Sequence, residues 1–279
     1  MLECRLNMEV KHMDFTPVLQ NDFFKEGFLG YGEKGDITAF SFAHILPLII
    51  GIGLILLIYF NRDRIRYSKY ENTYCVILGI LCIIGELLYY WRLCYVGGGG
   101  TNTKLTNMLT KFPLQVCDLT AIVSSIMMLN KNKSCYQYCA YVCLTLGLIP
   151  LFTVEQIASC GPTYLRYYQY WIQHIMPIVA TFYMTFVHNF KIEKKGIIIT
   201  LSLLYVLAAI SMYANATIPG AHFMYLAGDT FIAKYFPDSQ MLRLIIMTIA
   251  AIPLFFLVYY LVHKFNLKEE RRLNALITC

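Results

Sequence analysis

Apolar runs that approach 20 residues dominate the sequence, and one of them contains "IIGIGLILLIYF" at residues 49–60. A helix of about 20 apolar residues crosses the hydrocarbon core of a bilayer, so runs of this length constrain the fold more than any other feature. Only 14% of the residues are charged and 58% are hydrophobic, whereas soluble domains carry about 25% charged residues. We therefore expect a helical membrane protein that crosses the bilayer several times.

The apolar runs predict an all-α membrane fold in which seven transmembrane helices form one bundle. Residues 1–37 are polar and aromatic, and we expect an extracytoplasmic N-terminal segment without a cleaved signal peptide. Residues 38–264 would form the membrane domain, and residues 265–279 a cytoplasmic basic tail. The predicted spans cover residues 38–60, 74–96, 112–130, 135–154, 166–189, 196–217 and 241–263.

The distribution of Lys and Arg predicts the orientation of the bundle. Basic residues are concentrated after the first, third, fifth and seventh predicted spans, for example in "RDRIRYSK" at residues 62–69. Because short cytoplasmic loops are enriched in Lys and Arg, we expect the N-terminus outside and the C-terminus in the cytoplasm. This topology also accounts for the net charge of +6 without a nucleic-acid partner.

Several polar residues on different predicted helices lie at a similar depth. With the predicted orientation, Cys117 lies about 8 Å below the start of its helix, and His174, His44 and Glu86 also fall in the outer half of the membrane. The inner halves of these helices are less polar. Ionisable residues inside a membrane usually pair with one another or line a cavity. The shared depth therefore indicates one site in the outer half of the bundle.

Cys117 is the candidate nucleophile, although a cysteine in a membrane helix is most often a packing residue. A thiolate needs a nearby cation or base. Neither Gln115 nor Asp118 supplies one, so the base is expected from another helix, and His174 is the natural choice. The alternative for His174 is a hydrogen bond between helices. A Cys117–His174 pair would support covalent acyl transfer, with histidine as the general base.

The remaining polar residues have either structural or orienting roles, and the sequence does not choose between them. Glu86 and Asp118 either pair with Arg92 or orient a histidine. The glutamines either donate to an oxyanion or join helices. We therefore class seven residues as substrate-binding or orienting candidates: His44, Glu86, Gln115, Asp118, Gln169, Gln173 and His222.

We expect no metal and no cofactor. Cys135, Cys139 and Cys143 follow one another at intervals of four residues, but no fourth ligand lies nearby in the sequence, so packing is favoured. The histidines also lack the spacing of a metal site. Cys94 and Cys160 fall near the same membrane face, where a disulfide between them is possible.

Four motifs resemble those of one membrane protein family. They are "FSFAHILPLI" around His44, "GELLYYWRL" around Glu86, "FPLQVCDLTA" around Cys117 and "YYQYWIQHIMP" around His174. Together they resemble the bacterial YwaF-type proteins, whose eukaryotic relative is transmembrane protein 164. The resemblance covers about residues 36–265. It implies a seven-helix fold and a phospholipid acyltransferase that carries the acyl group on a cysteine, with a histidine partner, at Cys117 and His174.

The leading hypothesis is a multi-pass enzyme of the cell membrane, either a lipid acyltransferase or a lipid hydrolase. Its partner would be a membrane phospholipid or another acyl lipid. Cys117 would form the acyl intermediate and His174 would act as the base. Two alternatives remain open at this point: a small-solute or proton-coupled transporter, and a sensor without catalysis. Against transport, the helices show no inverted repeat and no paired broken helices.

Overall fold

The structure is a computed structural model that describes residues 37–96, 108–153, 161–162, 165–227 and 236–277, with side chains omitted at 91–96 and 276–277. Every regular element within these ranges is a helix, which confirms the all-helical prediction. The longer helices are α3 (Phe42–Arg66), α4 (Glu71–Val96), α6 (Val116–Asn130), α7 (Lys133–Cys143), α9 (Leu165–Phe186), α10 (Lys195–Thr217) and α11 (Gln240–Ile277). Three short helical segments are η1 (Leu146–Leu148), α8 (Ile149–Phe152) and η2 (Phe223–Tyr225).

At least one helix overlaps each of the seven ranges that the apolar runs predict, although α3, α4 and α11 extend beyond theirs. By length and composition, four helices of the described chain qualify as candidate membrane spans: α3, α4, α10 and α11. The bent pair formed by α7 and η1–α8 raises this number to five. Large apolar side chains on the four long helices are exposed, as expected where helices face lipid; examples are Ile49, Ile77, Ile198 and Leu257.

The predicted helix over residues 135–154 is in fact two segments that meet at an angle of 54°. The Thr145 hydroxyl donates to the Tyr141 carbonyl at 2.6 Å and thereby competes for a backbone acceptor. The next segment begins with η1 at Leu146, and Pro150, which has no backbone N–H, lies in the first turn of α8. These local features end α7 at Cys143 and turn the chain.

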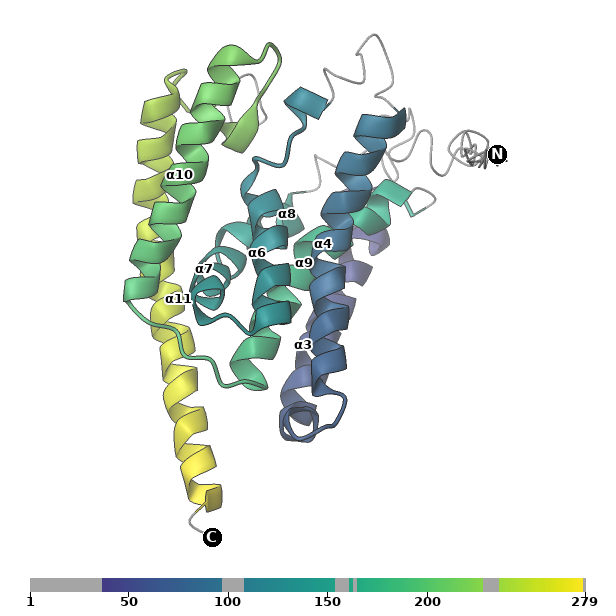
Figure 1. Ribbon diagram of the computed structural model, residues 1–279, viewed down its shortest axis with the longest axis vertical. Helices are drawn as coiled ribbons and strands as arrows, with labels where there is room; N and C mark the ends of the chain where they lie inside the picture. Colours follow the sequence, from purple (N-terminus) through teal and green to yellow (C-terminus); the bar gives the residue numbers. More distant parts are fainter. Residues whose placement is uncertain (1–36, 97–107, 154–160, 163–164, 228–235, 278–279) are drawn as a thin grey trace, which may run out of the picture.

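Helix α9 lies at the centre of the bundle and packs against α3, α4, α6 and α7 (Figure 1). Most of its side chains are buried, including polar ones such as Gln169 and Gln173. Figure 1 shows α10 and α11 along one side of the molecule and α3 and α4 along the other. Because α9 contacts so many neighbours, its polar side chains face protein rather than lipid.

Helices α4 and α9 approach closely at Gly85. A Cβ atom at this position would lie 2.9 Å from the Gln173 Cβ and 3.0 Å from the Gln173 Cα. Only glycine allows the two backbones to come this near. The close approach brings Glu86, the next residue of α4, to the glutamines of α9.

Helix α11 is longer than the sequence suggests. The predicted end of the last span, at residue 263, and the predicted start of a separate tail, at residue 265, both fall within this continuous helix. Asn266 and Glu269, which belong to the predicted tail, are buried. The Asn266 side chain accepts from the Ile192 N–H and donates to the Phe190 carbonyl, which packs this part of α11 against the loop after α9.

Cys139 and Cys143 are buried inside α7, and the Cys139 sulfur lies 3.3 Å from the Ser124 hydroxyl of α6. Both cysteines belong to the main apolar core. This environment fits the packing role that we assigned to them. The side chains of Arg92, Cys94 and Cys160 lie outside the described residues, as does the whole of the segment 1–36.

Candidate functional site

Cys117 lies in the first turn of α6. The helix begins at Val116, and Gln115 is its N-cap, with φ −82° and ψ 158°. The Gln115 backbone N–H donates to Asp118 Oδ2 at 2.9 Å. A carboxylate in the first turn that reaches back to the N-cap is half of a capping box. Asp118 therefore occupies an apolar region partly because it satisfies the backbone at the start of α6.

The position of Cys117 also affects its chemistry. The N-terminal end of a helix carries a partial positive charge, which stabilises an anion such as a thiolate. The Cys117 thiol itself donates to Asp118 Oδ1 at 3.4 Å, and the side chain is half-buried. The neighbouring carboxylate opposes thiolate formation, because two negative charges would then lie side by side. The helix end thus favours a thiolate at Cys117, whereas the Asp118 carboxylate opposes it.

A buried network joins this turn to α4 and α9. The Gln173 amide donates to Glu86 Oε2 at 2.6 Å and also lies 3.4 Å from Asp118 Oδ1. All three side chains are buried, at 4 to 7% exposure. A single amide therefore bridges two carboxyl groups that come from different helices.

The network continues along α9 towards its start. The Gln169 amide donates to the Gly85 carbonyl at 2.9 Å and to Gln173 Oε1 at 2.5 Å. The Arg166 guanidinium donates to Gln169 Oε1 and stacks over the Tyr89 ring at 4.5 Å. The structure thus brings together five of the predicted site residues: Glu86, Gln115, Cys117, Asp118 and Gln173. Gln169 joins them through Gln173.

His174 is half-buried and has one ring nitrogen engaged. Its Nδ1 lies 2.8 Å from the Tyr170 carbonyl oxygen. Because a carbonyl only accepts, this contact places the proton on Nδ1 and leaves the Nε2 lone pair as an acceptor. That is the tautomer a general base requires. Within the described part of the chain, however, the imidazole and the Cys117 thiol do not hydrogen-bond to each other.

His44 lies in a different environment. It is fully buried, and its Nδ1 accepts from the Phe40 N–H at 2.9 Å. Its Nε2 lies 2.8 Å from the Leu151 carbonyl, and its ring stacks on Trp171 with centroids 5.7 Å apart. Both ring nitrogens are occupied, so His44 joins α3 to α8. The structure does not bring it into the network of Cys117.

The segment after α10 covers the start of α6. Gln115 Oε1 accepts from the Met224 N–H at 2.7 Å, and its amide donates to the His222 carbonyl at 3.3 Å. Met224 and Tyr225 both have left-handed backbones, with φ of 56° and 57°. Such conformations are strained for residues other than glycine. The backbone of His222 thus contacts the site, while its side chain is exposed.

Tyr225 is a site residue that the sequence reasoning missed. Burial raises the pKa of its phenol, and negative charge on Cys117 or Asp118 would raise that pKa further. The Gln115 side chain accepts from the neighbouring Met224 N–H, which holds this segment against the start of α6. Tyr225 follows α10 by several residues, and two consecutive left-handed residues, Met224 and Tyr225, bring this segment back to the start of α6. No sequence pattern predicts this backbone conformation.

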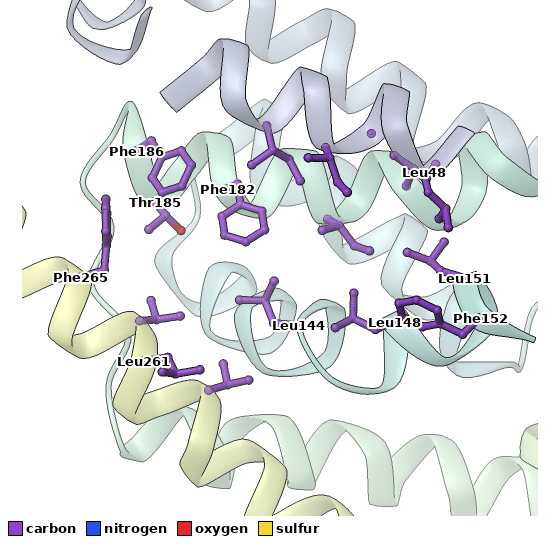
Figure 2. A pocket seen from close by; sticks show the side chains of 17 residues that line it. Leu48, Leu144, Leu148, Leu151, Phe152, Phe182, Thr185, Phe186, Leu261 and Phe265 are labelled. Atoms are coloured by element: carbon purple, nitrogen blue, oxygen red, sulfur yellow. The ribbon is translucent and has the colours of Figure 1, made fainter. Parts of the chain in front are cut away.

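An apolar cavity of about 530 Å³ lies on another side of α9. Figure 2 shows side chains such as Leu48, Phe182 and Leu261 converging on it from α3, α9 and α11. With 3.6 residues per turn, Gln173 and Ile175 point to roughly opposite sides of α9, and Ile175 lines the cavity. Helix α9 therefore lies between the polar network and the apolar cavity.

Comparison with known families decides the classification. A model of the TMEM164 family matches residues 39–259. The chain belongs to the TMEM164 family. Searches of curated proteins and of solved structures each found no match.

The region that matches the TMEM164 family starts before α3 and ends within α11, so it contains the whole network around Cys117 as well as His174. Family membership and several apolar helices together identify a membrane protein with transmembrane helices. The resemblance to transmembrane protein 164 that the motifs indicate is thus confirmed at the family level.

Proposed function

We propose that this TMEM164-family protein is a multi-pass enzyme of the cell membrane that transfers an acyl group from a phospholipid-type substrate through Cys117. In this proposal all seven helical regions cross the membrane, with the N-terminus outside and the C-terminus in the cytoplasm. His174 acts as the general base. The substrate is a membrane phospholipid or another acyl lipid, and the acyl acceptor is a second lipid or water.

The observation that carries the proposal is the position of Cys117. Its half-buried thiol lies in the first turn of α6, where the helix end favours a thiolate. The backbone N–H groups of a first helical turn have no acceptor within the helix. Those of Val116 and Cys117 are therefore suitable donors for the oxyanion of a tetrahedral intermediate. A packing cysteine would need neither feature.

The reaction proceeds in two balanced halves. In the first, His174 Nε2 accepts the thiol proton, and the sulfur of Cys117 attacks the ester carbonyl. The carbon–oxygen bond of the ester then breaks, and the departing lysolipid oxygen takes the proton from His174, which leaves a thioester. In the second, His174 deprotonates the acceptor hydroxyl, its oxygen attacks the thioester carbonyl, and the carbon–sulfur bond breaks as the sulfur takes the proton from His174, which restores the thiol.

The geometry sets one requirement for this reaction. The thiol donates to Asp118 in the structure, so it must turn away from that carboxylate and approach His174 Nε2. A substrate whose ester group lies near His174 would bring the reacting groups together.

The test uses full-length protein purified into phospholipid bilayers that contain a lipid with a labelled acyl chain. We expect a labelled protein that releases its label with hydroxylamine, as a thioester does, and labelled lipid product. Cys117→Ala should abolish the adduct, and His174→Gln should slow product formation by about 10²–10⁴-fold. Cys135→Ser, which alters a half-buried thiol at the start of α7, is the control and should behave as wild type.

Full acyl transfer by Cys117→Ala would refute the proposal. Solute uptake by the wild-type protein without any adduct would instead support the transport alternative. Specific binding of a ligand that persists in Cys117→Ala, again without an adduct, would support a sensor.

A further inference from the structure

A second cluster of reactive side chains lies at the other end of α4. Glu71 is the first residue of this helix, Cys75 follows one turn later, and His188 comes from the turn after α9. Glu71 Oε1 lies 2.9 Å from the Cys75 sulfur and 2.7 Å from His188 Nε2. The sulfur and this nitrogen are 3.8 Å apart. A carboxylate oxygen, a thiol sulfur and an imidazole nitrogen, each able to bind a metal ion, thus lie close together.

We propose that Glu71, Cys75 and His188 form a binding site for one zinc-like divalent cation. A thiolate, an imidazole and a carboxylate are the three ligand types that Zn²⁺ uses. All three donor atoms lie within 4.8 Å of one another. Because zinc binds such atoms at about 2.0–2.3 Å, small movements of the Glu71 carboxylate would make room for the ion.

Side chains around the cluster hold the Glu71 carboxylate in place. Lys131, at the end of α6, donates to Glu71 Oε2 at 2.5 Å and to Asn72 Oδ1 at 2.8 Å. The Tyr183 hydroxyl lies 3.3 Å from Glu71 Oε1. Metal-binding carboxylates are typically hydrogen-bonded in this way. The ammonium group occupies the second carboxylate oxygen, so the first remains directed at the cysteine and the histidine.

The backbone that carries His188 is also fixed. Arg66, the last residue of α3, donates to the Val187 carbonyl at 2.6 Å and to the Phe186 carbonyl at 2.8 Å. Asn189 follows with a left-handed backbone at φ 53°. These contacts direct the imidazole towards α4 rather than into the surrounding space.

A cavity of about 620 Å³ with a mixed polar and apolar lining adjoins the cluster at His188, which forms part of its lining together with Asp63, Arg66 and Asn189. A cation could enter from this side, and a water molecule from the cavity would complete a tetrahedral set of ligands. Glu71 and Glu86 are separated by about 22 Å along α4. The proposed metal site is thus distinct from the Cys117 site and does not depend on acyl transfer.

The test measures metal binding to purified full-length protein in detergent after treatment with a chelator. Added Zn²⁺ should raise the unfolding temperature, and Co²⁺ should bind at one equivalent with a near-ultraviolet thiolate-to-metal absorption band. Cys75→Ser and His188→Gln should each weaken binding by at least about 100-fold, because each removes a direct ligand. Cys135→Ser and Cys117→Ser should bind as wild type does.

Each variant is first compared with wild type in the presence of chelator, which shows whether it folds. If Cys75→Ser does not fold, His188→Gln carries the test. Absence of both the Zn²⁺ stabilisation and the Co²⁺ band in wild type would overturn the proposal and leave a hydrogen-bonded cluster around Glu71. Unchanged binding in His188→Gln would overturn it as well.

Discussion

At the scale of single residues, the neutral side chain of Gln173 contacts two buried carboxyl groups and a second glutamine. Its amide nitrogen lies against Glu86 and Asp118, and its oxygen accepts from Gln169. Buried carboxyl groups are costly unless they are hydrogen-bonded. This amide therefore does much to allow two acidic residues to remain in the interior of a membrane bundle.

We predict that Gln173→Met, which has a similar length but no amide, destabilises the protein by about 1–3 kcal/mol for each carboxyl group that loses its donor. The measurement is thermal unfolding in detergent. Met176→Leu, one turn further along α9, is the control and should cost less than about 1.5 kcal/mol, because it exchanges one apolar side chain for another. An unchanged unfolding temperature for Gln173→Met would show that other groups satisfy the carboxyls.

At the scale of helices, the contact between α4 and α9 sets the position of the network. The backbone of Gln173 lies so close to Gly85 that any larger residue would push the two helices apart. The same displacement would separate Glu86 from the Gln173 amide. Helix packing and site geometry are therefore coupled at one glycine.

We predict that Gly85→Ala lowers stability by about 1–3 kcal/mol, the usual cost of overpacking. Gly53→Ala is a matched control, since a Cβ at that position of α3 meets no atom within 4 Å. It should be neutral or stabilising, because alanine is favoured over glycine in helices by about 1 kcal/mol. Thermal unfolding of both variants checks the pair, and an equal response of the two would contradict the packing argument.

At the scale of the whole molecule, the end of α11 is tied to the end of α3. Arg272 pairs with Asp63 at 2.8 Å and with Glu269 at 2.5 Å, and Arg62 pairs with the same Glu269 at 3.1 Å. Glu269 is buried, with 4% of its side chain exposed, so its charge needs these partners. The first and last long helices are joined by this cluster.

We predict that Arg272→Met destabilises the protein by about 1–3 kcal/mol: the partly exposed pair with Asp63 contributes little, but buried Glu269 loses one of its two arginine partners. The loss relative to wild type should shrink at high salt, which screens the pair in the wild-type protein. Arg271→Met changes the neighbouring exposed residue and should have little effect. Unfolding temperatures measured at low and high salt test both expectations.

Particular residues show how far the sequence alone could lead. Helix rise makes depth readable from position along the chain, and on that basis Cys117, His174, His44 and Glu86 were expected to share one site. In the structure Glu86 is linked through Gln173 to Asp118, which accepts from the Cys117 thiol, whereas His174 is not hydrogen-bonded to Cys117. The role of Asp118 as a helix cap was missed, because the predicted helix began earlier, at residue 112, whereas α6 begins at Val116. His44 was assigned to the same site by depth, yet it faces α8 instead. Depth carries no information about which neighbour a side chain faces.

The sequence by itself determined that this protein is helical and belongs in a membrane, and it determined which stretches of the chain contain the long helices, though not all of their ends. Those properties depend on local composition and on the cost of placing an unpaired backbone in lipid. Only the tertiary structure decided which groups meet: Gln173 with Glu86 and Asp118, Gln115 with the backbone of Met224, and His188 with Glu71 and Cys75. Such encounters depend on helix rotation and on close contacts such as that at Gly85, and residues far apart in the chain leave no periodic signal of them.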